Sequence, residues 1–348
     1  MDSIAPLSRR IAVRAMVLAI IAGLPFQPAA GQSADPEKTD SALQRGRQLT
    51  AFLLAGRIDS LFPRMARPFQ ASIGGRVGLT KFMEQVHALG LEIGAPDEAV
   101  YRENGTVSYY RIGEFEGLPS GTIYWAWDSA GTIQGVVVRP TPSVASSRFA
   151  GRKTRTPLRL PFEGAAYVAW GGRAPHQNYH AVFADQRFAS DFFLLDGGAI
   201  HRGDGTRNED FACFERAIVA PAPGTVRAVL DTVADNRPGR LNPDLPPGNH
   251  VVIEHGHGEY SVLAHLRQGS VRVRPGDRVK RGQAVGTCGN SGNSSAPHLH
   301  YHLQTRAQPG SGVGLPAQFR NYQSDGRDVP VGEPLRGQRV QATPRSRG

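Results

Sequence analysis

The chain has 348 residues, of which 40% are hydrophobic and 20% are charged. A single hydrophobic core usually stops growing below this length, and the composition is that of a globular protein, so we expect two folded domains. The formal net charge of +10 favours anionic partners. Because the arginines are scattered and no nucleic-acid-binding motif accompanies them, the charge does not indicate binding to nucleic acid.

Residues 1–31 have the composition of a secretory signal. Three arginines are followed by a short apolar stretch at 15–26 and by small residues at 29–31, which a signal peptidase requires. The apolar stretch is shorter than the roughly 20 residues that span a bilayer, so an uncleaved membrane anchor is the weaker interpretation. We therefore predict an exported protein, periplasmic or secreted, with no stable insertion in a membrane.

Residues 41–140 combine helical and strand patterns. Apolar residues recur at helical intervals up to residue 91, which predicts two or three helices. The period then changes, and we expect strands at 107–112, 122–127 and 133–138, with a hairpin turn before the last. Helices followed by a curved antiparallel sheet resemble the cone-shaped domains of the nuclear transport factor-like type. The resemblance implies a small α+β domain.

The remainder of the chain is expected to be mainly β. A segment rich in Pro, Ser and Arg at 141–162 predicts a linker. From 163 to 335, short β-like runs alternate with turns that contain Gly or Pro, which predicts an antiparallel β domain. Within it, residues 232–248 form a long aperiodic insertion that could wall one side of a cleft. Residues 336–348 are basic and predict a disordered tail.

Histidines are concentrated in the second predicted domain. Ten of the eleven lie between His176 and His302, and the densest group is Pro297-His-Leu-His-Tyr-His302. Side chains two residues apart on a strand share one face, so His298 and His300 can reach the same ion. Neutral imidazole is a preferred zinc ligand. The sequence therefore indicates a metal site, rather than a polar surface strand or a tract that binds metal adventitiously.

Three segments form an ordered pattern, and the last of them includes His298 and His300 of this histidine group. They are Ile218-Val-Ala-Pro-Ala-Pro-Gly-Thr-Val226, Gly248-Asn-His-Val-Val-Ile-Glu-His-Gly256 and Gly289-Asn-Ser-Gly-Asn-Ser-Ser-Ala-Pro-His-Leu-His300. In this order they resemble the lysostaphin-type zinc endopeptidases, which cleave peptide cross-links in bacterial cell walls. In that family the second histidine of a His-x-His pair binds zinc, while the first histidine and another on the preceding hairpin are catalytic. The resemblance implies one zinc ion with His300 as a ligand, and His298 and His265 as catalytic residues.

The other two zinc ligands depart from the family pattern, in which a histidine and an aspartate lie four residues apart. Here the best candidates are His180 and Asp191, eleven residues apart. They lie in Asn-x-His and Gln-Arg-aromatic-Ala-x-Asp patterns, which similar chains of the superfamily carry, and a turn could return both side chains to one ion. His201 with Asp204 is the competing pair, and Asp185 is a lesser alternative to Asp191.

The implied chemistry is hydrolysis. Two histidines and one aspartate leave the fourth position of tetrahedral zinc for water, whose pKa the ion lowers towards about 7. The two catalytic histidines would move the water proton and stabilise the oxyanion. No His-Glu-x-x-His helix is present, so the glutamate-based scheme does not apply. His302 lies one step beyond His300 on the same strand face and is expected beside the ligands or at the rim of the site.

Two cysteines, Cys213 and Cys288, lie in this predicted exported chain. They are too few and too far apart for a metal site of the Cys-x-x-Cys type. Because disulfides persist outside the cytoplasm, we predict a disulfide between them, with two buried thiols as the alternative.

The predicted function is that of an exported zinc metalloendopeptidase whose substrate is the stem or cross-bridge peptide of peptidoglycan. The basic charge is consistent with an anionic cell envelope as partner. Two alternatives remain, a catalytically silent relative that binds cell wall or regulates another hydrolase, and a general zinc protease of Gly-rich proteins. A biotin or lipoyl carrier, which the turn-strand phrase at 276–286 also suggests, is disfavoured because no hairpin of the Met-Lys-Met kind is present.

Overall fold

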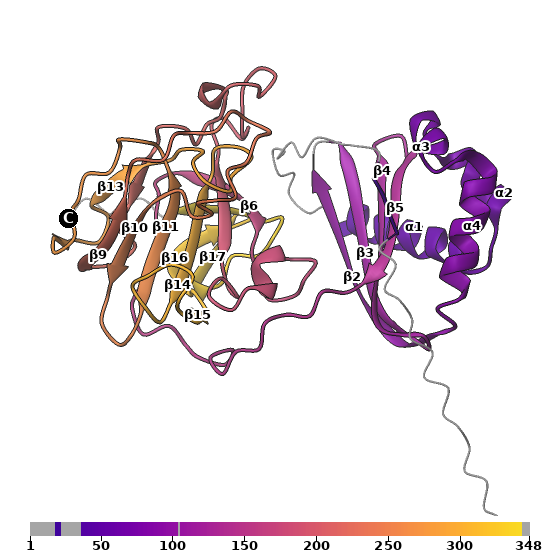
Figure 1. Ribbon diagram of the computed structural model, residues 1–348, viewed down its shortest axis with the longest axis horizontal. Helices are drawn as coiled ribbons and strands as arrows, with labels where there is room; N and C mark the ends of the chain where they lie inside the picture. The colour runs from indigo at the N-terminus through magenta and orange to yellow at the C-terminus, as the bar shows by residue number, and fades with distance from the viewer. Residues whose placement is uncertain (1–17, 22–35, 104, 343–348) are drawn as a thin grey trace, which may run out of the picture. The chain divides into compact units, whose positions relative to one another are not determined.

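The computed structural model describes residues 18–21, 36–103 and 105–342 (Figure 1). Of the predicted signal, only Leu18–Ile21 falls within this part, where it forms strand β1. The rest of the signal lies outside the described residues. Within the described ranges, none of the helices combines the length and the apolar character needed to cross a membrane.

The chain forms two compact units, the first built mainly from residues 40–100 and 107–141. Its helices bury one apolar face each, and the buried side chains of the last helix follow the i, i+3, i+4, i+7 spacing: Leu79, Phe82, Met83 and Val86. The helices are α1 (Pro36–Leu54), α2 (Ile58–Leu61), α3 (Arg67–Ser72) and α4 (Gly75–His87), with a 3-10 turn η1 (Phe62–Arg64).

A five-stranded sheet completes the first unit. Its order is β1-β5-β4-β3-β2, and its later strands are β2 (Glu92–Glu103), β3 (Thr106–Phe115), β4 (Leu118–Asp128) and β5 (Ile133–Pro140). Helix and sheet share one core, in which the fully buried Trp125 indole donates a hydrogen bond to Thr50 of α1 at 3.1 Å. The predicted helix-plus-sheet class is thus confirmed for this unit, whereas its resemblance to nuclear transport factor-like domains stays a prediction.

The second unit consists mainly of residues 142–342 and is dominated by one eleven-stranded sheet. Figure 1 shows β9, β10, β11 and β14 side by side. Its pairings are antiparallel, as predicted. In spatial order the strands are β12 (Arg278–Val279), β9 (Gly224–Leu230), β10 (Asn249–Glu254), β11 (Tyr260–Leu266), β14 (Leu299–Gln304), β7 (Ser190–Leu194), β6 (Ala165–Trp170), β18 (Arg339–Ala342), β16 (Phe319–Ser324) and β17 (Arg327–Gly332). β15 (Gly314–Leu315) pairs with β14, and β8 (Ala217–Val219) pairs with β13 (Ala284–Thr287).

The predicted linker at 141–162 is wrong for its second half. Leu158, Leu160 and Phe162 are buried in the main core of the second unit. The preceding residues are also held, because the fully buried carboxylate of Glu259 accepts hydrogen bonds from the backbone N–H groups of Arg155 and Thr156. Alternating apolar residues pack against the sheet, and their burial outweighs the local turn-like composition.

The predicted disordered tail at 336–348 is also wrong over residues 336–342. Arg339–Ala342 form β18, which pairs with both β6 and β16. The buried Arg336 guanidinium lies 4.2 Å from the Trp170 ring and donates to the carbonyl of His176 at 2.8 Å. A basic composition therefore does not prevent order here, because the arginine contacts an aromatic face and the backbone completes a sheet. Residues 343–348 lie outside the described part.

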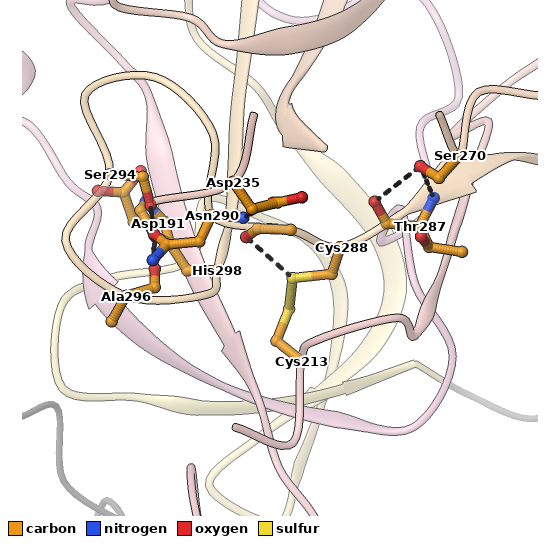
Figure 2. Close-up of a disulfide and its surroundings, with 11 residues drawn as sticks. Asp191, Cys213, Asp235, Ser270, Thr287, Cys288, Asn290, Ser294, Ala296 and His298 are labelled. Carbon is orange, nitrogen blue, oxygen red and sulfur yellow. Dashed lines mark hydrogen bonds and ion pairs between the residues drawn. A yellow bond between two sulfur atoms is a disulfide. The ribbon is translucent and has the colours of Figure 1, made fainter. Parts of the chain in front are cut away.

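Cys213 and Cys288 form a disulfide with a Cα–Cα distance of 5.7 Å, as predicted. Both residues are buried in the main core. Figure 2 places Cys288 close to the segment that runs through Asn290 and Ser294 to His298. The disulfide thus anchors the chain just ahead of the histidine-rich strand.

Removing this disulfide is expected to lower the free energy of unfolding by about 4 kcal/mol, because it closes a long loop in the unfolded chain. The two cysteines are 75 residues apart. Urea unfolding of a Cys213→Ser/Cys288→Ser double variant checks the magnitude. Alkylation of denatured, unreduced wild-type protein should label neither cysteine, and two labelled thiols would contradict the assignment.

Candidate metal centre

Two neighbouring strands bring an aspartate and a histidine together. Leu299, Tyr301 and Leu303 of β14 join the main core, so the alternate residue His300 faces the opposite side of the sheet. His300 is the cross-strand partner of Asp191 on β7. Its Nδ1 atom lies 2.9 Å from Asp191 Oδ1, and both side chains are buried.

His180 reaches the same place from a short 3-10 turn, η2 (Tyr179–Val182). Its Nε2 atom lies 3.7 Å from Asp191 Oδ2, and its ring centroid is 4.7 Å from that of His300. Ligand atoms of His180, Asp191 and His300 all lie within 4.8 Å of one another. The turn and β7 thus bring together two residues eleven positions apart, as the proposed insertion between ligands requires.

Asn178 fixes the orientation of the His180 ring. The Asn178 amide nitrogen donates to the carbonyls of Gly172 and Ala189, at 3.1 and 2.9 Å, so its oxygen must point the other way. That oxygen lies 2.9 Å from His180 Nδ1 and accepts its proton. His180 Nε2 is therefore left with a lone pair directed at Asp191.

His265 approaches the centre from β11 with an unusual backbone. Its φ is 60°, in the left-handed region that side chains other than glycine rarely adopt. The register of β10 and β11 shifts at this point, between the pairs of Asn249 and Val251. A bulge of this kind re-aims a side chain. The His265 ring lies 4.8 Å from that of His298 and 5.6 Å from that of His300, measured between centroids.

His298 and His265 both present a bare Nε2 atom. His298 Nδ1 lies 2.8 Å from the carbonyl oxygen of Ala296, and His265 Nδ1 lies 2.8 Å from that of Ser291. Because a carbonyl oxygen only accepts, each Nδ1 carries the proton. His298 Nε2 then faces Asp191 Oδ1 at 3.7 Å, and the ring stacks on Phe193 with centroids 5.0 Å apart.

The donor set fits a cation. The His180 and His298 nitrogens that face Asp191 carry lone pairs, and the carboxylate oxygens also only accept hydrogen bonds. Several acceptor atoms therefore meet at a buried place where none of these groups donates a proton to another. Such a convergence is costly unless a positive charge lies between the atoms. Two imidazoles and one carboxylate are a set that zinc prefers.

An open cleft of about 440 Å³ gives access to part of this centre. Its floor includes His180, His265 and His300, and Tyr179 lines one side. Pro246 and its neighbour line it too, so the 232–248 insertion contributes to the wall as expected.

Burial dominates the protonation of the histidines. It lowers the pKa of His180 to about 3, although Asp191 acts in the opposite direction. Burial likewise holds the pKa of His265 and of His302 well below the usual value, and it lowers the pKa of His298. Burial raises the pKa of Asp191, but the histidines around it outweigh that effect and its pKa is lowered. The folded protein therefore keeps neutral rings beside an ionised carboxylate.

These shifts predict that the metal-free protein is less stable at pH 5 than at pH 7. The unfolded chain protonates its histidines near their usual pKa of 6.5, whereas the buried rings do not, so the unfolded state gains protons as the pH falls and stability is lost below about 6.5. Each ring that stays neutral at pH 5 should cost about 2 kcal/mol. The lowered pKa of Asp191 contributes only at lower pH, below its ordinary value of 3.8, and so adds nothing to this difference.

Urea unfolding with a chelator present, at the two pH values, measures the difference. A His265→Asn variant has no titrating ring at that position, so its stability should differ less between pH 5 and pH 7. Equal midpoints at pH 5 and pH 7 for the wild type would contradict this account.

Among the described residues, none of the competing candidates, His201, Asp204 and Asp185, belongs to the cluster of possible ligands. Asp204 is exposed and accepts hydrogen bonds from the backbone and the hydroxyl of Thr206, as an aspartate in a turn does. Asp185 lines the cleft, where it accepts the backbone N–H of Gly310 at 3.1 Å.

His302 lies beside His300, as expected, with its Nδ1 2.9 Å from His300 Nε2. Gln304, which sequence reasoning missed, lies next to His302 at 3.1 Å. Strand alternation could have indicated Gln304, because it is the next residue after His302 on the same face of the strand. Asn178 is the first residue of the Asn-x-His pattern, but its role depends on the carbonyls of Gly172 and Ala189, which that pattern does not include.

Comparison with known proteins identifies the second unit. The model of peptidase family M23 matches residues 206–311. This match contains His300 and the two histidines beside it, whereas His180 and Asp191 precede it. The second unit therefore contains a peptidase M23 domain, and the resemblance to lysostaphin-type endopeptidases is confirmed. The match to a peptidase family supports the predicted class, a metallopeptidase.

Curated relatives match a short segment. The peptidoglycan DD-endopeptidase ShyA of Vibrio cholerae is 44% identical over 62 residues, which are 18% of this chain and 14% of that protein. An uncharacterized metalloprotease of Haemophilus influenzae is 36% identical over 101 residues, which are 28% of this chain and 18% of that protein. The DD-carboxypeptidase/endopeptidase Mpg of Neisseria meningitidis is 35% identical over 68 residues, or 20% and 15%. The chain thus spans less than a fifth of the length of these relatives.

Solved structures with a similar arrangement include the catalytic domain of lysostaphin from Staphylococcus simulans, which is 21% identical and has a TM-score of 0.27. The alignment covers 44% of this chain and 87% of that one. The catalytic domain of the prophage-encoded M23 protein EnpA from Enterococcus faecalis is 24% identical over the same shares, again with a TM-score of 0.27.

Proposed function

We propose that this protein is an exported zinc endopeptidase that hydrolyses peptide bonds in peptidoglycan stem or cross-bridge peptides. The observation that carries the proposal is the convergence of His180, Asp191 and His300, of which the two histidines line an open cleft. Two further imidazoles, those of His265 and His298, lie beside them. The M23 match and the relatives named as peptidoglycan endopeptidases support the same reaction.

His180 Nε2, an Asp191 oxygen and His300 Nδ1 would hold one zinc ion. A zinc ion there would supply a Lewis acid that polarises the scissile carbonyl and lowers the pKa of a water molecule. Asp191 contributes the only negative charge of the set, and its lowered pKa keeps that charge at neutral pH. Asn178 holds the His180 ring so that no proton blocks the ligand atom.

His265 and His298 are proposed as the catalytic pair. Each ring holds a proton on Nδ1 and a lone pair on Nε2, so either can take a proton from the attacking water and then, as the protonated ring, return that proton to the leaving amine. Fixed carbonyl partners keep both rings in this tautomer and orientation. His302 is proposed to act beside the ligands and not as a fourth one.

The substrate proposal rests on three features that point to the cell wall. A predicted signal at 1–31 would deliver the protein outside the cytoplasm, and its net charge would attract an anionic polymer. Apolar and aromatic side chains line the cleft, which suits a peptide backbone more than a highly charged ligand.

Purified mature protein should release new amino groups from isolated peptidoglycan. A chelator should stop the release, and added zinc should restore it. Casein and a Gly-rich protein are offered in parallel. Cleavage of the Gly-rich protein with intact peptidoglycan would favour the general protease, and zinc binding without cleavage of either would favour the silent relative. Activity that survives thorough chelation would contradict the proposed chemistry.

A further inference from the structure

A row of three buried polar side chains extends from the metal centre along one face of β14. His300 Nε2 lies 2.9 Å from His302 Nδ1, and His302 Nε2 lies 3.1 Å from Gln304 Oε1. Relative exposures are 5%, 3% and 0% along the row. Water therefore cannot easily substitute for a missing partner, so every proton in the row must match an acceptor.

Gln304 sets the direction of the row. Its amide nitrogen donates to the carbonyls of Arg306 and Gln308, at 2.8 and 3.1 Å. Turning the amide over would place its oxygen against two carbonyl oxygens, which cannot donate. The amide oxygen therefore faces His302, and His302 Nε2 must carry the proton.

This assignment propagates to the metal ligand. With its proton on Nε2, a neutral His302 has only a lone pair on Nδ1, so His300 must donate from its Nε2. A neutral His300 then has a bare Nδ1, which is the atom nearest Asp191.

The His300 proton has a second possible position, on Nδ1, and the row is needed to disfavour that position. His300 Nδ1 lies 2.9 Å from Asp191 Oδ1, so without the row the His300 proton would be favoured on Nδ1, in a hydrogen bond to the carboxylate. That proton would lie between His300 Nδ1 and Asp191 Oδ1, the two atoms proposed to bind the metal ion. A metal ion would then have to displace it before binding.

We propose that Gln304 and His302 are positioning residues that select the Nε2–H tautomer of His300 and so keep its Nδ1 lone pair, and the Asp191 oxygen, ready for the metal ion. The proposal rests on the proposed zinc site. The tautomer of His300 in the metal-free protein can be measured whether or not the protein is catalytically active.

The direct test is the tautomer of each ring in the metal-free full-length protein. Two-bond ¹⁵N–¹H spectra of ¹⁵N-histidine-labelled protein at pH 8 should show Nε2–H for both His300 and His302. In a Gln304→Leu variant, the His300 signal should move towards Nδ1–H. An Nδ1–H tautomer of His300 in the wild type, or no change on Gln304→Leu, would overturn the proposal.

Zinc affinity, measured by competition with a chromogenic chelator, supplies the second test. Changes to partners of metal ligands typically weaken binding by about 10- to 100-fold, and we expect this range for His302→Leu and Gln304→Leu. His302→Asn should recover most of the affinity, because an asparagine oxygen can occupy the position of His302 Nδ1 and accept from His300. Equal losses in His302→Asn and His302→Leu would overturn the tautomer explanation.

His255→Leu is the matched control. His255 is a half-buried histidine of the same unit that is also bonded at both nitrogens, to Pro223 and Ser261, and it is not among the possible metal ligands. The zinc affinity of the His255→Leu variant should equal that of the wild type. A wild-type protein that binds no zinc would contradict the proposed function alone, since the tautomers are measured without metal. If His302→Leu fails to fold, the wild-type and Gln304→Leu spectra still decide.

Discussion

Replacing His300 by alanine is expected to leave the purified protein without stoichiometric zinc and without detectable hydrolysis of peptidoglycan. His300 Nδ1 and Asp191 Oδ1 are 2.9 Å apart, and the change leaves two of the three proposed ligands. Loss of a partner behind a ligand already weakens metal binding by about 10- to 100-fold, so loss of a ligand should weaken it by more than about 100-fold. His180→Ala and Asp191→Ala should behave in the same way.

Metal analysis after dialysis against a weak chelator measures this effect, with circular dichroism to show that each variant is folded. His201→Ala is the informative control, because His201 with Asp204 is the competing ligand pair. Full zinc in His180→Ala combined with loss of zinc in His201→Ala would move the assignment to that pair. His255→Ala, a change away from the centre, should keep zinc at the wild-type level.

Replacing His298 or His265 by alanine is expected to spare the zinc and remove turnover. Their bare Nε2 atoms lie beside the proposed ligands, but both side chains are proposed to move protons and not to hold the ion. General acid–base assistance by a positioned side chain contributes about 10²- to 10⁴-fold, so the rate of peptide release should fall by that factor. Parallel assays of zinc content and of released amino groups separate binding from catalysis.

Glutamine at either position offers a sharper comparison than alanine, since it keeps a polar side chain but cannot accept and return a proton near neutral pH. His298→Gln and His265→Gln should therefore be as inactive as the alanine variants. Release of zinc by either change would show that the division into ligands and catalysts is incorrect. Unchanged turnover would remove the residue concerned from the mechanism.

Local sequence patterns were sufficient for the class of fold and for the position of the histidine group. Strand alternation places His298 and His300 together, because side chains two apart share a face whatever the rest of the chain does. The same local rule predicted the strands of the first unit and the antiparallel β character of the second. The order of motifs along the chain was sufficient to predict the resemblance that the match of residues 206–311 to peptidase family M23 bears out.

Composition alone misled at two places. The segment before Phe162 was assigned to a linker and the segment after Arg336 to a disordered tail, because Pro, Ser and basic residues are common in such regions. Both segments are ordered by partners distant in sequence, Glu259 for the first and β6 for the second. Local composition carries no information about a buried carboxylate or an open sheet edge more than a hundred residues away.

Which second pair of residues lies next to His300 follows from strand pairing and not from the local sequence. Sequence left His180 with Asp191 and His201 with Asp204 as alternatives, since either spacing can be closed by a turn. The pairing of β7 with β14 brings Asp191 opposite His300, and Asn178 turns the His180 ring towards them. Proton positions were equally beyond the sequence, because a histidine tautomer depends on which neighbours can only donate or only accept. Those neighbours, such as the carbonyls that orient Gln304, are backbone atoms whose positions follow from the folded chain and not from residue identity.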